Sequence, residues 1–424
     1  MNNKKSKTKA YVYPKVPIMY KDDFPRGYRP WIDGWCFPIN KLRGKLPDGT
    51  YKLLTLDISI NTDDYVELVN KGLRASLSQR AEKNYKCEIG CKHCFECRTD
   101  TNNLLLSFKE VRQLMLQAEK LGLETVKFLG PGELLHNPKL FEILDFFEKE
   151  NIKIGIFTKG VILGDDELAQ KIFNCTAKDL CARLAGYSCV RLLIGFTSAD
   201  KKTEAKRLQT NIKNFSAKRN RGIENIAALG FNSDPKCQKM ALICTPVMKD
   251  NINEAFSIVK WGVMRNIPVV VAPTMVSGKG LEMAEINDNS FKRKSLVSLY
   301  AKIYSWMISR GIFTLKQLKK EGVSPYAGVV CSQFISGMFI RKDGRIQACP
   351  GNETAAFRYC NDIRKSNLRS VWKNSLGYKI RTELIKTHQL TVSQPCYAKT
   401  EGPLVLKGSI ATDFYQLVID KLKK

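Results

Sequence analysis

The sequence has no run of about 18 apolar residues, which argues against a membrane-spanning helix. No apolar stretch follows the basic N-terminus, MNNKKSKTKA, so the chain does not begin like a secretory signal. We therefore expect a soluble cytoplasmic protein with no membrane partner. Histidine is also scarce, with only His93, His136 and His388. So few imidazoles make mixed Cys/His zinc sites hard to build.

Acidic residues are outnumbered: 69 Lys and Arg face 41 Asp and Glu, giving a formal net charge of +28. Such an excess permits binding to RNA, DNA or another acidic surface. The charge is spread over the whole length, however, so it favours no single nucleic-acid-binding segment. Residues 206–221 carry six basic residues and no acid. A solvated helix face is the simpler interpretation of that segment, and a phosphate or polynucleotide contact is the alternative.

Cysteine, by contrast, is abundant, with 14 residues. In a chain that is not secreted, this number indicates reduced thiols and metal ligands rather than disulfides. Three of them form a Cys-x3-Cys-x2-Cys loop, Cys87, Cys91 and Cys94. Thiolates suit iron–sulfur clusters, and three of them leave one iron of a four-iron cluster open to a substrate or cofactor. The alternatives are three buried structural cysteines, or a zinc site with Cys97 as its fourth ligand.

Strands and helices alternate along most of the chain. A capping box at Ser107 and Glu110 opens the first long helix, which we expect to end at Gly122. The hydrophobic pattern predicts strands at 51–60, 125–129, 153–157, 190–196, 240–247 and 267–272. It predicts helices at 107–121, 137–147 and 252–265, and a long helical region that follows the fourth strand and ends near residue 229. Such alternation implies βαβ units and a parallel sheet. About six units are present, fewer than the eight of a closed barrel.

The cysteine loop resembles that of the radical S-adenosylmethionine (radical SAM) superfamily, and the resemblance extends over about residues 85–285. It implies an α/β fold with a partial (β/α)6 TIM-like barrel, and a [4Fe-4S] cluster on Cys87, Cys91 and Cys94. It also implies an enzyme that reductively cleaves SAM to a 5′-deoxyadenosyl radical, which abstracts hydrogen from a peptide or small-molecule substrate. An electron donor such as flavodoxin or ferredoxin would be a partner. Many members have an aromatic residue before the third cysteine, where this chain has His93.

Two strand ends resemble cofactor-binding elements of that superfamily. The turn 130–133 resembles its Gly-Gly-Glu element, which binds the SAM amino group; Pro131 departs from it, so the resemblance carries over to Gly132 and Glu133. Thr158 begins a Thr-Lys-Gly sequence where many relatives have Thr-Asn-Gly, which implies that its hydroxyl faces SAM. Ordinary strand-end turns are the simpler interpretation of both.

Two later strand ends give weaker signals. Thr197 and Ser198 follow the fourth strand and are candidates for the SAM ribose or the substrate. The turn 277–280, after the sixth strand, resembles the Gly-rich turn of related enzymes, although no Walker spacing surrounds it.

A second resemblance lies near the C-terminus. Cys331 is followed by 12 residues, Gly344, four residues and Cys349, as at the start of the SPASM and twitch extensions, which hold auxiliary iron–sulfur clusters. Residues 338–340 and 345–347 flank a turn and predict a hairpin. Cys360 and Cys396 are available to complete a second cluster, or are buried apolar thiols. The later cysteine array of a full SPASM domain is missing, so we expect one auxiliary cluster at most.

These observations predict four parts: an irregular N-terminal extension (1–50), a radical SAM core (51–289), a helical linker (290–325) and a SPASM- or twitch-like α+β domain (326–424). Two alternatives remain for function. One is a radical SAM enzyme that modifies RNA. The other is a non-catalytic, basic nucleic-acid-binding protein with structural Cys-zinc sites. We expect core packing for the remaining cysteines, Cys36, Cys97, Cys175, Cys181, Cys189, Cys237 and Cys244.

Overall fold

The computed structural model describes residues 11–30, 32–35, 37–59, 89–96, 105–130, 132–208, 210, 212–272, 277–280, 293–321, 332–351, 355–391 and 412–423. Several residues that the sequence singled out lie outside these ranges: Cys36, Cys87, Cys97, Pro131, Cys331 and Cys396. No helix in the described ranges combines the length and hydrophobicity needed to cross a membrane.

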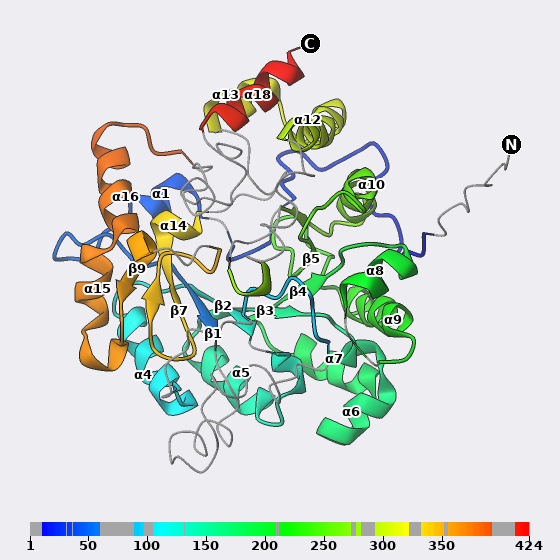
Figure 1. Cartoon of the computed structure of the whole chain (residues 1–424), viewed down its shortest axis with the longest axis horizontal. Helices are drawn as coiled ribbons and strands as arrows, with labels where there is room; N and C mark the ends of the chain where they lie inside the picture. Colours follow the sequence, from blue (N-terminus) through cyan, green and yellow to red (C-terminus); the bar gives the residue numbers. More distant parts are fainter. Residues whose placement is uncertain are drawn as a thin grey trace, which may run out of the picture.

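One nine-stranded sheet forms the centre of the molecule, in the order β6-β5-β4-β3-β2-β1-β7-β8-β9 (Figure 1). Its strands are β1 (Thr55–Ser59), β2 (Thr125–Gly130), β3 (Lys153–Thr158), β4 (Val190–Gly195), β5 (Met240–Cys244), β6 (Val269–Val271), β7 (Gly337–Ile340), β8 (Ile346–Gln347) and β9 (Arg358–Cys360). All pairs from β6 to β7 are parallel, whereas β8 and β9 are antiparallel. The six predicted parallel strands are therefore confirmed, with shorter ends for β1, β5 and β6.

Side chains alternate between the two faces of the parallel strands, as the strand geometry requires. On β3 and β4, residues such as Ile154, Ile156 and Leu192 join the main core beneath the helices. Leu193 instead belongs to a second cluster on the inner face of the curved sheet, with Phe157 packed against it. Both faces are thus apolar, which explains the nearly continuous hydrophobic runs of these strands.

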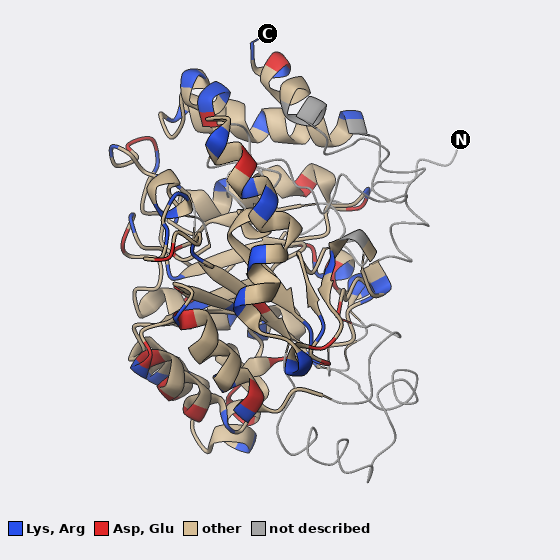
Figure 2. Ribbon diagram, turned by 90° about the vertical axis from the view of Figure 1, so that its left-hand side faces the viewer, with Lys and Arg blue, Asp and Glu red and all other residues tan. Residues whose placement is uncertain are grey.

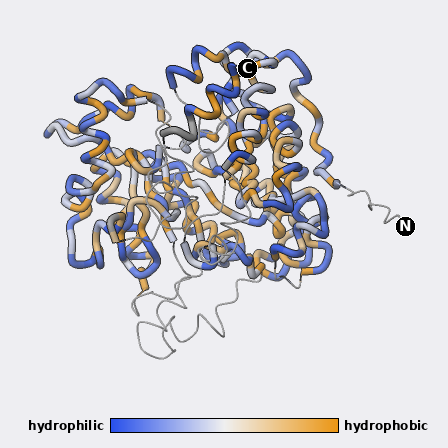
Figure 3. The backbone as a smooth tube through the Cα atoms, turned by 45° about the horizontal axis from the view of Figure 1, so that its top comes forward, coloured by the Kyte–Doolittle hydropathy of each residue, from blue (hydrophilic) through white to orange (hydrophobic). Residues whose placement is uncertain are grey.

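Helices cover the outer face of the sheet (Figure 1). They are α4 (Phe108–Glu119), α5 (Leu140–Lys149), α6 (Asp166–Phe173), α7 (Ala177–Ala185), α8 (Lys201–Arg207), α9 (Phe215–Ala228) and α10 (Ile252–Val263). Ser107 and Glu110 form the predicted capping box of α4. Hydrophobic and hydrophilic residues alternate along these helices in Figure 3, as expected for helices with one buried side.

Three helical details differ from the sequence prediction. The helix α4 ends at Glu119, before Gly122, which has a φ of +89°. The sequence did not predict α6 and α7, which are only 8 and 9 residues long. The single helical region expected up to residue 229 is two helices, α8 and α9, because Asn214 adopts the left-handed conformation directly before α9.

The N-terminal extension closes the amino end of the barrel. We call residues Ile32–Trp35 the N-terminal plug. Ile32 and Trp35 are buried in the inner cluster of the sheet. Asp33 pairs with Lys153 at 2.8 Å and with Arg191 at 2.6 Å, at the starts of β3 and β4. This segment, expected to be irregular, therefore completes the inner core through tertiary contacts, with the one-turn helix α1 (Ile39–Leu42) after it.

The C-terminal region continues the same sheet. The predicted hairpin is confirmed as β7 and β8, and β7 pairs directly with β1. The remaining helices are α12 (Arg293–Ser309), α13 (Leu315–Glu321), α14 (Gln333–Ser336), α15 (Leu368–Asn374), α16 (Leu376–Lys386) and α18 (Thr412–Leu422). Short 3-10 turns occupy Leu134–His136, Ile162–Gly164, Ala355–Phe357 and Ile363–Lys365. The helix α12 packs against both α10 and α18. The four-part division of the chain stays a prediction.

Candidate active site

A cavity lies at the carboxyl ends of the parallel strands, the usual place for the site of a parallel barrel. It holds about 1040 Å³ of empty space, counting the part open to solvent. Its wall is largely apolar, with Leu129, Phe157, Leu193, Ile243 and Val270 from the inner face of the sheet. Trp35 of the N-terminal plug also lines it.

The cysteine loop, residues 89–96, borders this cavity. The Cys91 and Cys94 side chains line it together with His93. Neighbouring segments hold the loop: Lys92 N donates to Arg207 O, and Lys279 N donates to Cys94 O, both at 3.0 Å. The turn 277–280 that the sequence singled out therefore supports the cysteine loop.

Close packing fixes that contact. Gly278 has a φ of +52°, and a Cβ there would lie 2.5 Å from Phe95 O and 2.7 Å from Cys94 O. Only glycine fits such a position without displacing one of the two segments. Within the ranges that the structure describes, no group of three His, Cys, Asp or Glu residues converges as a metal site; Cys87, the third residue of the motif, lies outside them.

Glu133 is fixed to the end of β3. It accepts a hydrogen bond from the Thr158 hydroxyl, and both of its carboxylate oxygens lie 3.0 Å from Lys159 N. Thr158 Oγ1 also accepts from Gly160 N at 2.9 Å. The predicted residues Gly132, Glu133 and Thr158 thus come together beside the cavity. The Thr158 hydroxyl is directed at Glu133, so it orients that carboxylate.

His93 lies in the cysteine loop and lines the cavity. Burial, followed by the positive charges of Lys159 and Arg207, lowers its pKa well below the ordinary value. Its Nδ1 atom is buried and has no hydrogen-bond partner among the described residues. The same is true of Thr245 Oγ1, at the end of β5, which the sequence did not single out. Both residues line the cavity, although these two atoms are themselves buried.

Lys159 is the main residue that the motif comparison overlooked. It lines the same cavity as Cys91. Burial raises the pKa of the Cys91 thiol, and the positive charge of Lys159 opposes that rise. Burial lowers the pKa of Lys159, but the charges of Cys91, Glu204, Glu133 and Cys94 outweigh burial, so the pKa is raised. The sequence pattern singled out Thr158 of the Thr-Lys-Gly sequence and assigned no role to Lys159.

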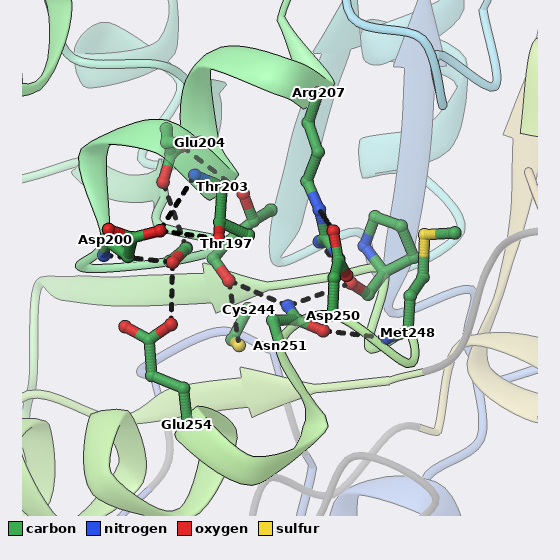
Figure 4. A network of polar contacts seen from close by, with 12 residues as sticks. Thr197, Asp200, Thr203, Glu204, Arg207, Cys244, Met248, Asp250, Asn251 and Glu254 are labelled. Atoms are coloured by element: carbon green, nitrogen blue, oxygen red, sulfur yellow. Dashed lines mark hydrogen bonds and ion pairs between the residues drawn. The ribbon is translucent and has the colours of Figure 1, made fainter. Parts of the chain in front are cut away.

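A buried polar network supports the ends of β4 and β5 (Figure 4). Glu204 accepts from Thr197 Oγ1 at 3.3 Å and Ser198 N at 2.9 Å, and pairs with Arg219 at 3.0 Å. Ser198 Oγ donates to Glu254 at 2.6 Å. Thr197 and Ser198 are almost completely buried in this network, so the structure gives them a supporting role in place of a cofactor contact.

The same network corrects the interpretation of the basic segment 206–221. Arg207 is buried, pairs with Asp250, and donates to Pro246 O at 2.8 Å. Arg219 is 1% exposed and lies over the Phe196 ring, 4.0 Å from its centroid. The expectation of a solvated face is wrong for these two residues, and neither is placed to contact a polynucleotide.

The C-terminal cysteines lie on and after the hairpin. Cys349 follows β8 and accepts a hydrogen bond from Gly351 N at 3.3 Å. The next residue, Pro350, accepts from Ser277 Oγ at 2.7 Å, so Cys349 is adjacent to the turn that supports the cysteine loop. Cys360 pairs with Ile346 across β8 and β9, and its thiol contacts Ser366 Oγ at 3.4 Å. Cys331 and Cys396 lie outside the described residues.

Five other cysteines are described, all as free thiols. Core packing is confirmed for Cys181, Cys189 and Cys244, which are buried. Cys175 is partly buried against the same core. Cys237 instead contacts Asp33 of the N-terminal plug at 3.5 Å.

Comparisons with known proteins agree with this geometry. Residues 82–256 match the family model of the Radical SAM superfamily. SuiB from Streptococcus suis, in a crystal structure with precursor peptide SuiA, is 15% identical with a TM-score of 0.50, over 78% of this chain and 68% of SuiB. Native anSMEcpe with bound AdoMet is 13% identical with a TM-score of 0.51, over 87% of this chain and 96% of that one.

No curated protein matches the chain in sequence. At such low identities the two structures show a shared fold alone. The family match therefore identifies residues 82–256 as a region that matches the Radical SAM superfamily domain.

Proposed function

We propose that the protein is a radical SAM enzyme that holds a [4Fe-4S] cluster on Cys87, Cys91 and Cys94 and binds SAM in the adjoining cavity. The observation that carries this proposal is the meeting of Cys91 and Cys94 with Gly132 and Glu133 at one cavity. Cysteine sulfur is the ligand that iron–sulfur clusters take.

The residues around the cavity fit both cofactors. When reduced by a donor such as flavodoxin or ferredoxin, the cluster supplies the one electron that cleaves SAM to methionine and a 5′-deoxyadenosyl radical, which takes a hydrogen atom from the substrate. Glu133 retains acceptor capacity, because a carboxylate has about four lone-pair sites, and it accepts the SAM ammonium group. Gly132, with a φ of +80°, has open space on its Cβ side among the described atoms, so a ligand can approach its backbone.

Other residues shape the reaction space. Trp35, Phe157 and Leu193 give the cavity an apolar wall that excludes water from a reactive radical. We propose a peptide or small molecule as the substrate; in support, SuiB shares the fold and was crystallised with a precursor peptide.

We also propose that Cys349 helps to hold an auxiliary cluster, with Cys331, Cys360 and Cys396 as the further ligands. Its place next to the turn 277–280 supports a site close to the cysteine loop. Modification of RNA is a weaker proposal, because the side chains of Arg207 and Arg219 are buried and already paired with carboxylates.

Anaerobic reconstitution tests these proposals. Iron and sulfide are counted per chain, and 5′-deoxyadenosine is measured after adding SAM and dithionite. The control is a Cys87/Cys91/Cys94→Ala variant. About eight irons falling to about four, with cleavage abolished, indicates two clusters. A count of about four irons in the wild-type protein that falls to none in the variant would support the radical SAM enzyme without an auxiliary cluster. Zinc without iron or sulfide in the wild-type protein would instead favour a non-catalytic protein with structural Cys-zinc sites.

A further inference from the structure

Lys159 places a positive charge against the cysteine loop from the opposite wall of the cavity. Its backbone is fixed, because Lys159 N donates to the Glu133 carboxylate at 3.0 Å. Its side chain packs against Gly195 of β4 and lines the same cavity as Cys91. A lysine is therefore held between the expected cluster ligands and the expected SAM-binding carboxylate.

Gly195 on β4 makes room for this side chain. A Cβ at Gly195 would lie 2.8 Å from both Lys159 Cδ and Nζ. Any larger residue there would push the ammonium group away from its present place. Two residues that are distant in sequence thus combine to bring one charge to Cys91.

We propose that Lys159 is a positioning residue that donates a hydrogen bond to the Cys91 sulfur in the cluster-loaded protein and raises the reduction potential of the catalytic cluster. The inference rests on the proposed function. Hydrogen bonds to the sulfur ligands and nearby charge are two of the factors that set the potential of such clusters. Reduction adds a negative charge to the cluster, and an adjacent ammonium group stabilises that charge more than it stabilises the oxidised state.

The test is a potentiometric titration of the reconstituted protein without SAM, followed by electron paramagnetic resonance. The signal that changes when SAM is added afterwards identifies the catalytic cluster. Lys159→Met is expected to shift its midpoint to more negative potential, and Lys159→Arg to keep most of the wild-type value. Lys153→Met is the matched control. Lys153 begins β3, whereas Lys159 follows its last residue, and Lys153 pairs with Asp33. This variant should leave the midpoint unchanged.

Gly195→Ala is a second test of the inference, because it keeps Lys159 but fills the space that the lysine side chain occupies. We expect this variant to shift the midpoint potential in the same direction as Lys159→Met. It tests the role of Lys159 even if the Lys159→Met variant does not retain its iron. A wild-type midpoint in an iron-loaded Lys159→Met variant, or in Gly195→Ala, would overturn the inference. Weaker SAM binding with an unchanged midpoint would assign Lys159 to the SAM carboxylate and also overturn it. A wild-type protein without any iron–sulfur signal would instead refute the proposed function.

Discussion

Thr158 and Glu133 operate as a pair at the end of β3. The Thr158 hydroxyl and the Lys159 backbone N–H both donate to the Glu133 carboxylate, which leaves part of it to accept from a ligand. A hydrogen bond to a charged group is worth about 1.5–3 kcal/mol. The orientation of Glu133 therefore depends on Thr158 by an amount that binding measurements can detect.

We expect Thr158→Val to raise the dissociation constant for SAM about tenfold, which corresponds to about 1.4 kcal/mol. The variant keeps the shape of the side chain but removes the hydroxyl that holds Glu133. Calorimetry on the reconstituted protein without reductant would measure this. Thr158→Ser, which keeps the hydroxyl, serves as the control and should bind within a factor of two or three of wild type. Equal SAM affinity in Thr158→Val and wild type would show that Glu133 needs no such support.

At the scale of elements, the contact between the turn 277–280 and the cysteine loop has no spare space. We expect Gly278→Ala to reduce the iron retained per chain after reconstitution, because its Cβ would displace the backbone of Cys94 or Phe95. The substitution is unfavourable for two reasons: the steric overlap of the new Cβ and the positive φ of the backbone. Gly311→Ala separates them: Gly311 has a φ of +69° and no described atom within 4 Å of the added Cβ. Full iron content in Gly278→Ala would mean that the loop tolerates the shift.

The N-terminal plug is tied to the barrel by charge as well as by packing. Asp33→Asn would leave the nearly buried Arg191 without its carboxylate, and we expect it to lower the free energy of unfolding by roughly 2–4 kcal/mol. This is somewhat less than the about 3–5 kcal/mol of a fully buried pair, because Asp33 is partly exposed. Denaturant unfolding would measure the change, with Asp23→Asn, an exposed residue of the same extension, as control.

This pair also predicts an acid dependence. Burial raises the pKa of Asp33, but hydrogen bonds and charges from Lys153 and Arg191 outweigh it, so its pKa is lowered. A carboxyl with a lowered folded-state pKa stabilises the fold above its unfolded pKa of about 3.9, and this stabilisation is lost as pH falls through the folded value. The stability difference between wild type and Asp33→Asn should therefore shrink below about pH 4. A difference that stays constant down to pH 2 would exclude the ion pair as its source.

The elements that the sequence predicted well are those with a local signal. The capping box of α4 and the apolar runs of β2 to β6 specify their own structure. The cysteine motif can be found from the spacing of its residues alone. The plug, Lys159 and Gly195 could not be predicted in this way. Their roles depend on which strand residues face inward together, and that follows from the register of β3 against β4. The burial of Arg219 was not predicted for the same reason, because its partner Glu204 lies on another helix.

At the scale of the whole molecule, the excess of positive charge is distributed. Lys and Arg occur on most of the helices visible in Figure 2, interspersed with Asp and Glu. Several of the arginines support the interior. Arg381, for example, is completely buried and donates to Leu42 O at 2.6 Å and Lys52 O at 2.7 Å. The net charge therefore gives little information about a nucleic-acid partner.

The C-terminal region is joined to the barrel along the full length of one strand. Residues 55–58 of β1 pair with 337–340 of β7. Trp372, also fully buried, donates from Nε1 to Tyr51 O at 2.8 Å, and Arg381 bonds the segment that leads into β1. Removing this region would expose one edge of β1 and leave several buried carbonyl groups without donors. Unsatisfied groups of this kind cost about 1–3 kcal/mol each.

We therefore expect a chain that ends at residue 325 to lose the native barrel, even though it contains the whole predicted core. The expected signs are loss of cooperative thermal unfolding and rapid proteolysis within residues 51–289. The control is Arg381→Met in the full-length chain, which keeps the β1–β7 pairing and should unfold cooperatively at a reduced temperature. A truncated chain that melts cooperatively near the full-length temperature would show that the core folds alone. The predicted boundary at 326 would then divide two independent domains, and the parallel pairing of β7 with β1 would be a docking contact between them.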